Sequence, residues 1–194
     1  QDLLVQSSKD KLLTAARAFA DRLSDATSDI AADIKFIETL PLTLQVIEHA
    51  PGPASDNPEQ RQLEQVFASL LAARPEYAQI RLIDAANHGK ELVRVDRDLA
   101  GIKIVTGRQL QEKGHFPYVF ETVRLPAGQL YISEINLNRE LGSHLGFGKP
   151  TIRVATTTQS RTHKQAVIVI NVNLDGLFKH IHNDLPANSN ALLT

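Results

Sequence analysis

The stretch 165–178, QAVIVINVNLDGLF, decides the fold of this chain. Apolar side chains occupy odd and even positions alike from Ala166 to Ile170, whereas a strand with one wet face alternates apolar and polar residues. The pattern therefore predicts a central strand over 166–174 that is covered on both faces. Asp175 is a residue type favoured at helix N-termini, so we expect a short helix directly after the strand.

Four segments upstream show the two-residue period of strands. Residues 77–84 and 91–98 flank the turn AANHGK and predict a hairpin, and 129–137 and 151–159 predict two further strands. Short turns between strands favour antiparallel pairing. With 166–174, these segments predict a five-stranded antiparallel sheet.

The N-terminal part of the chain is predicted to be helical. Residues 2–39 lack Pro and Gly and repeat apolar side chains every seven residues, which predicts one helix of roughly 50 Å. Such a helix either lies wholly on its own sheet or packs on the sheet at one end and on a partner helix at the other. Pro41 should interrupt it before 42–49, and Asn57 and Pro58 should open a further helix.

The two faces of the sheet need different covers. The N-terminal helices can cover one face, and the insertion 99–127, with helical stretches near 108–113 and 117–124, must cover the other. We therefore expect an α+β fold, in which a long N-terminal helix packs on a five-stranded antiparallel sheet whose other face lies under a loop and helix insertion. A sheet roofed by such an insertion favours a small-molecule pocket.

Composition excludes several classes of function. The 194 residues carry 21 basic and 22 acidic side chains, so no basic excess indicates nucleic-acid binding. The absence of cysteine excludes disulfides and thiolate catalysis. We see no nucleophile with its base, no phosphate-binding loop and no histidine pair at metal-ligand spacing, and so predict a non-catalytic domain without cofactor or metal. The chain lacks methionine even at position 1, so we expect it to be a piece of a longer protein.

Four segments resemble a known family: PEYAQIRLIDAANHGKELVRVDR (75–97), LQEKGHFPYVFETVRLPAGQLYISEINLNRELG (110–142), KPTIRVATTT (149–158) and AVIVINVNLDGLF (166–178). With them the chain resembles the Cache (PDC, PAS-like) extracytoplasmic sensor domains of bacterial transmembrane receptors. These receptors include sensor histidine kinases, diguanylate cyclases and chemoreceptors. The resemblance runs from about residue 60 to residue 181.

The resemblance implies a place for this chain within a receptor. Residues 1–50 would be a helical stalk, 51–181 the sensor module, and 182–194 a linker with the start of a following module, as in the membrane-distal half of a double-Cache sensor. The expected function is periplasmic sensing of a small ligand for a membrane-anchored kinase or GGDEF-type regulator. The alternative is a ligandless structural or dimerisation module. We also expect a homodimer through the N-terminal helix.

The resemblance also indicates the ligand site. Many Cache domains hold an amino-acid carboxylate with an Arg and aromatic residues of the insertion, and the ammonium with an Asp of the last strand. Here Tyr118 matches an aromatic residue, His115 or Phe116 stands where the Arg is expected, and Asn171 stands in place of the Asp. Without these two charges the pattern argues against an α-amino acid ligand.

Other residues suggest contacts on the basis of their own chemistry. Arg153 lies in an apolar strand, where it could bind a carboxylate or phosphate, reach out to water, or pair with Glu134. Tyr131 and Ser133 share one strand face, and core packing also accounts for the tyrosines. The predicted ligand-binding residues are His115, Tyr118, Tyr131, Ser133, Arg153 and Asn171.

Overall fold

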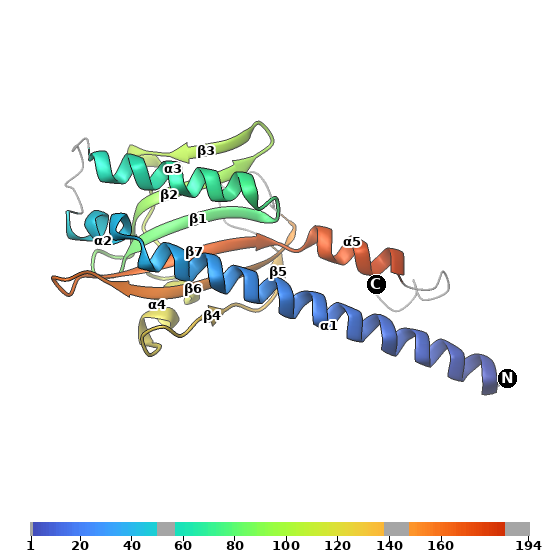
Figure 1. Cartoon of the computed structure of the whole chain (residues 1–194). Coiled ribbons are helices and arrows are strands. Elements are labelled where there is room, and N and C mark those ends of the chain that lie inside the picture. The colour runs from blue at the N-terminus through green and yellow to red at the C-terminus, as the bar shows by residue number, and fades with distance from the viewer. Residues whose placement is uncertain (1, 50–56, 138–147, 185–194) are drawn as a thin grey trace.

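A computed structural model describes residues 2–49, 57–137 and 148–184 and has the predicted α+β architecture (Figure 1). The helices are α1 (Asp2–Thr39), α2 (Pro41–Glu48), α3 (Pro58–Ala73), the 3-10 turn η1 (Gly107–Gln109), α4 (Pro117–Arg124) and α5 (Asp175–Asp184). The strands are β1 (Tyr77–Asp84), β2 (Lys90–Asp98), β3 (Gly101–Val105), β4 (Tyr131–Ile132), β5 (Asn136–Leu137), β6 (Pro150–Gln159) and β7 (Gln165–Asn173).

Within the described residues the sheet has seven strands instead of the predicted five. Its order is β3-β2-β1-β7-β6-β4, with β5 also paired to β6, and all pairings are antiparallel. The strand β7 therefore lies in the middle, between β1 and β6. This position explains its continuous apolar sequence, because a central strand has no edge and no wet face.

The extra strand β3 falls in a region predicted to be loop. It folds back on β2 through a tight turn in which the Asp98 carboxylate accepts hydrogen bonds from the backbone N–H groups of Ala100 and Gly101 at 2.7 and 3.0 Å. Gly101 has a φ of 130°, which favours glycine. Local turn chemistry thus creates an edge strand that the period of the sequence did not reveal.

The predicted strand 129–137 is broken into two short pieces, β4 and β5. The N–H of Ser133 still bonds to the carbonyl of Arg153 at 2.9 Å. The N–H of Arg153, however, donates to the Ser133 hydroxyl at 2.9 Å, so a side chain replaces the backbone acceptor. The ladder is interrupted there, before β5 resumes the pairing with β6, because a serine hydroxyl competes with backbone pairing.

Apolar packing joins the helices to one face of the sheet (Figure 1). Even-numbered residues of β7, including Ile168 and Ile170, pack with Leu63 and Phe67 of α3 and with Ile34 of α1, all at most 1% exposed. Odd-numbered residues of β7 face the opposite side, under α4. The prediction that β7 is covered on both faces is confirmed.

The long helix α1 lies only partly on the sheet. Its C-terminal turns bury Ile30 and Ile37, whereas Val5 and Leu12 near its start are 67% and 45% exposed. Figure 1 shows this N-terminal part extending past the sheet in the same direction as α5. The reading in which the helix packs wholly on its own sheet is therefore wrong, and packing on a partner helix stays a prediction.

The helices α2, α3 and α5 begin where the sequence predicted. Pro41 separates α1 from α2, and the Asn57 side chain accepts the N–H groups of Glu59 and Gln60 at 2.9 and 3.2 Å, which caps α3. The helix α5 begins at Asp175, whose N–H is accepted by the side chain of Asn173 at 2.9 Å.

Candidate ligand-binding site

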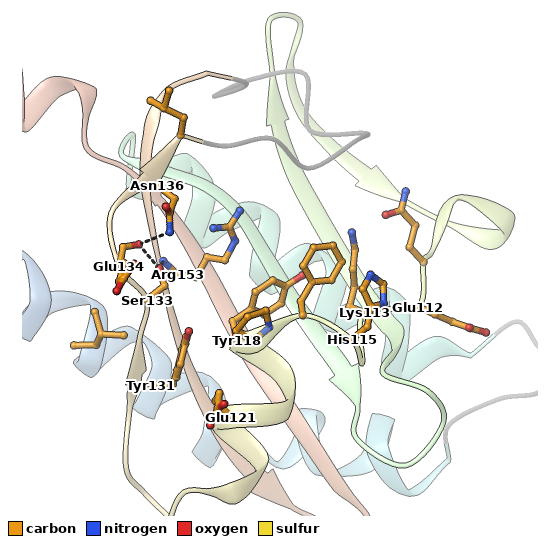
Figure 2. A pocket seen from close by; sticks show the side chains of 15 residues that line it. Glu112, Lys113, His115, Tyr118, Glu121, Tyr131, Ser133, Glu134, Asn136 and Arg153 are labelled. Atoms are coloured by element: carbon orange, nitrogen blue, oxygen red, sulfur yellow. Dashed lines mark hydrogen bonds between the residues drawn. The ribbon is translucent and has the colours of Figure 1, made fainter.

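A cavity of about 940 Å³ lies between the sheet and the insertion that carries α4 (Figure 2). Its wall is built from the segment 111–118, from β4 and β5, and from Arg153 of β6. The volume falls in the range of about 300–1,000 Å³ typical of small-molecule sites. The predicted roof is thus present, and it borders a cavity with room for a ligand.

Five of the six predicted site residues line this cavity: His115, Tyr118, Tyr131, Ser133 and Arg153. The sixth, Asn171, does not line it and is only 1% exposed. It points from β7 into a buried polar cluster, where it bonds to Arg81 and Gln79. Direct contact of the five lining residues with a ligand stays a prediction.

Aromatic rings form one side of the cavity. The rings of Phe116 and Tyr118 are stacked, with centroids 5.4 Å apart, and the His115 ring lies 4.3 Å from that of Phe116. These residues flank Pro117, the first residue of α4, whose fixed φ suits a helix start. The start of α4 therefore presents a flat apolar surface to the cavity.

Two cationic side chains lie beside these rings. The Nζ of Lys113 is 4.8 Å from the centre of the Phe116 ring, and the guanidinium carbon of Arg153 is 5.5 Å from the centre of the Tyr118 ring. Figure 2 shows Tyr118 between Arg153 and Lys113. Both cations are buried, at 4% and 9% exposure, so Arg153 is not a solvated edge residue.

The acidic side chains of the lining lie farther out. Glu112 and Glu134 are exposed, and Glu121 is half-buried and lies 3.7 Å from the exposed Arg124. Burial, together with the nearby Glu121, raises the pKa of Tyr131 above its ordinary value, although Arg153 opposes this shift. The buried part of the lining is therefore cationic, and its rim is acidic.

Beneath this wall, the roof-facing side of the sheet carries a buried polar cluster made of Gln79, Arg81, Glu91, Arg94, Asp96 and Asn171. Arg94 forms a forked ion pair with Asp96, with nitrogen–oxygen distances of 2.8–3.1 Å. Burial lowers the pKa of Arg94, but Asp96 and Glu91 outweigh it, so the pKa is raised. Two arginines and two carboxylates balance in charge, as burial requires.

The sequence analysis missed this cluster. Its members come from β1, β2 and β7, and their only signal is the recurrence of polar residues at alternate positions, as in Gln79 and Arg81 or Arg94 and Asp96. Alternation by itself is what an ordinary solvated strand face shows. Only the cover supplied by the roof turns these residues into a buried network.

A close backbone contact attaches the roof to the β1–β2 turn. The N–H of Lys113 donates to Gly89 O at 2.8 Å, and the N–H of Gly114 donates to His88 O at 3.0 Å. A Cβ on Gly89 would lie 2.2 Å from the backbone nitrogen of Gly114. The roof can dock here only because Gly89 and Gly114 both lack side chains.

The described part of the chain has no group of three or more His, Asp or Glu side chains placed to hold a metal ion. Within those same residues, no helix is both long and apolar enough to cross a bilayer.

Several solved sensor domains share this fold. The extracellular domain of the histidine kinase vpHK1S-Z8 superposes with a TM-score of 0.76 at 17% identity, covering 93% of this chain and 62% of that one. A sensory box/GGDEF family protein from Vibrio parahaemolyticus gives 0.69 at 18%, with 91% and 63% covered. The Vibrio cholerae DctB sensor domain gives 0.67 at 14%, with 92% and 60% covered. At these identities the likeness concerns the fold, and the chain spans less than two thirds of each structure.

No curated protein matches the chain. The family model of the bacterial histidine kinase sensor domain, however, matches residues 5–191, nearly the whole sequence. This match agrees with the fold and with the extracytoplasmic, periplasmic location expected for a sensor. The predicted sensor role is thereby confirmed: the chain belongs to the family of bacterial histidine kinase sensor domains.

Proposed function

We propose that this domain senses a small organic anion that binds in the cavity between the sheet and the roof. The observation that carries the proposal is the sign of the buried charges: Lys113 and Arg153 are buried in the lining, whereas Glu112 and Glu134 are exposed. A carboxylate between two partly desolvated cations gains charge-assisted hydrogen bonds. An ammonium group would meet like charges there.

The stacked rings of Phe116 and Tyr118 support a ligand with a flat apolar body. The lining also includes the apolar side chains of Ile132 and Leu137, which are about half exposed. Asn171 lies outside the lining, so it offers no partner to an ammonium group. An aromatic or branched carboxylate without an amine therefore fits the site better than an α-amino acid. The ligand-binding domain of the chemoreceptor Tlp3 from Campylobacter jejuni was crystallised with the amino acid 4-methylisoleucine. The ligand class proposed here for this chain is different, because it lacks the amine.

A thermal-shift screen with matched ligands tests this proposal. Benzoate and isovalerate should raise the melting temperature, whereas the neutral benzamide and isovaleramide and the cationic benzylamine should not. A ligand present at about 100 times its dissociation constant adds about 2.7 kcal/mol of stability. Arg153→Met and Lys113→Met should each abolish the shift, and Lys103→Met, outside the cavity, should leave it intact. Equal shifts with neutral and anionic ligands would contradict the proposal.

The alternative function is a ligandless dimerisation module, and the exposed start of α1 is the observation that favours it. Val5, Leu12 and Leu13 are 67%, 45% and 49% exposed, and Leu12 belongs to the heptad repeat. A second copy of α1 would bury these side chains in a coiled coil. Sedimentation should show a dimer that Leu12→Asp dissociates, whereas Glu59→Gln on α3 should not. A monomer at high concentration contradicts the dimer.

The parent protein, in this proposal, is a membrane-anchored receptor with a histidine kinase or diguanylate cyclase output. The direction of the chain supports it: β7 leads directly into α5, and α5 lies against α1, where the rings of Phe178 and Phe19 are 5.9 Å apart. A shift of β7 on ligand binding would move α5 relative to α1. Such a shift requires that the ligand bind the two states with different affinity.

A further inference from the structure

Arg81 occupies the point where the cavity wall meets the centre of the sheet. It lies on the roof-facing side of β1 and is fully buried. Its Nη1 donates to the Tyr118 hydroxyl at 2.7 Å, and its Nη2 donates to Asn171 Oδ1 at 3.0 Å. Its guanidinium carbon is also 4.7 Å from the centre of the Tyr118 ring. One side chain thus joins a wall residue of the roof to the central strand β7.

Glu91 extends this connection to the other end of the wall segment. Its Oε1 lies 3.7 Å from Nη1 of Arg81, and its Oε2 accepts the backbone N–H of Gln111 at 2.9 Å. Gln111 and Tyr118 both line the cavity. The buried pair of Arg81 and Glu91 therefore contacts both ends of the segment 111–118.

Neither Arg81 nor Glu91 lines the cavity, so neither can act on a ligand except through the wall. A guanidinium holds its donors in a rigid planar fork, which allows Arg81 to bond Tyr118 and Asn171 at the same time. A lysine carries a single nitrogen on a flexible stem and cannot reproduce that geometry. Away from water these charge-assisted bonds are stronger than on the surface.

We propose that Arg81 is a positioning residue of the ligand site. It holds the Tyr118 ring in the cavity wall and connects that ring to Asn171, two residues before the end of β7 and four before the start of α5. Glu91 supports it by fixing Gln111. The assignment of a ligand to this cavity rests on the proposed function, but the geometry that Arg81 imposes on Tyr118 exists without ligand.

Fluorine NMR of the ligand-free domain tests the positioning directly. The chain has three tyrosines and no tryptophan, so labelling with 3-fluorotyrosine gives three signals, and Tyr118→Phe and Tyr131→Phe assign two of them. Arg81→Lys should shift or broaden the Tyr118 signal and leave the Tyr131 signal unchanged. Leu82→Ala is the matched control, because this adjacent residue is equally buried but faces the helices. It should weaken the fold without moving the Tyr118 signal.

The link to β7 has its own test. Asn171→Leu removes the acceptor of Arg81 at nearly constant side-chain size and should shift the Tyr118 signal, since Arg81 bonds to both residues. The same substitution should have no further effect in an Arg81→Lys background, because the connecting fork is then absent. Asn171→Leu leaves the Arg81–Glu91 pair in place, so this variant tests the link to β7 even if Arg81→Lys does not fold. An unchanged Tyr118 signal in either single variant overturns the proposal.

Binding of benzoate separates this inference from the proposed function. If both hold, Arg81→Lys should raise the dissociation constant of benzoate at least tenfold, although Arg81 does not touch the cavity. If benzoate and isovalerate fail to bind the unaltered domain, the anion proposal fails while the NMR result still decides the role of Arg81. If benzoate binds but Arg81→Lys changes neither its affinity nor the Tyr118 signal, the positioning role fails alone.

Discussion

The two faces of the sheet are closed in different ways. The face under α1, α2 and α3 is sealed by one continuous apolar cluster that includes Phe67, Leu63 and Ile168. The face under α4 has a small apolar cluster around Val119 and Val167, and beside it lie the buried charges and the cavity. The contrast teaches that one face supplies stability and the other supplies a shaped site, since buried ion pairs are weak evidence for stability.

The largest loss of stability should come from a cavity made on the helix-covered face. Phe67 of α3 is fully buried in the apolar cluster, so Phe67→Ala should lower the free energy of unfolding by about 3–5 kcal/mol. Urea denaturation measures it. Tyr131→Ala, a half-buried wall residue on the other face, should cost far less. Equal losses at the two positions would show that both faces contribute alike to stability.

The next largest loss of stability should come from disturbing the charge balance under the roof. Glu91→Gln keeps the shape of the side chain but removes the negative charge between Arg81 and Arg94, which lie 3.7 and 3.5 Å away. Leaving buried charges uncompensated typically costs about 3–5 kcal/mol, and the retained amide should place this variant near the lower limit. Glu112→Gln, on the exposed rim, serves as the control and should be neutral in the same urea titration. A neutral Glu91→Gln would show that the cluster tolerates excess positive charge.

A smaller loss of stability is expected from replacing glycines that have positive φ. A comparison of two such glycines separates the cost of backbone strain from the cost of blocking the close approach of the roof. Gly89 and Gly107 both have positive φ, 67° and 59°, but only at Gly89 would a Cβ meet other backbone atoms. Gly107→Ala should therefore cost the strain alone, about 1–2 kcal/mol. Gly89→Ala should cost more and also weaken protection of the Lys113 and Gly114 amides in hydrogen exchange. Equal costs would mean that the roof can move away freely.

The smallest effect is a dependence on pH at the helix-covered face. The Tyr77 hydroxyl donates to Asp33 at 2.6 Å, and burial, this bond and the Asp33 charge raise the pKa of Tyr77. The stabilisation is fully present below the ordinary phenol pKa of about 10 and is lost as pH rises from there towards the higher folded value. Unfolding midpoints measured from pH 8 to 11 should fall above pH 10, and Tyr77→Phe should flatten that fall. An identical fall in the variant would assign it to other groups.

Much of the fold could be predicted because its signals are local. The apolar run of β7, the cap at Asn57 and the prolines that begin α2 and α4 each act on neighbouring residues. The two errors in the predicted strands have local causes that hydrophobic periodicity does not record. Asp98 folds β3 back on β2, and the Ser133 hydroxyl interrupts the strand predicted over 129–137.

The candidate site was only partly predictable. His115, Tyr118, Tyr131, Ser133 and Arg153 were predicted for the roof and its facing strands and do line the cavity. Lys113 was missed, because a lysine between Glu112 and Gly114 looks like a surface residue until the roof docks over it. Asn171 was expected in the lining but bonds to Arg81, which lies 90 positions earlier in the chain.

The sequence by itself determined which strand is central and that both of its faces are covered, because hydrophobic periodicity records the burial of each side chain along one strand. Only the tertiary structure decided which polar side chains meet beneath the roof. Arg81, Glu91 and Asn171 come from three different strands, and their contacts depend on strand register and on the docking of Gly114 against Gly89. Such partners are set by distances in space, which the spacing of residues along the chain does not encode.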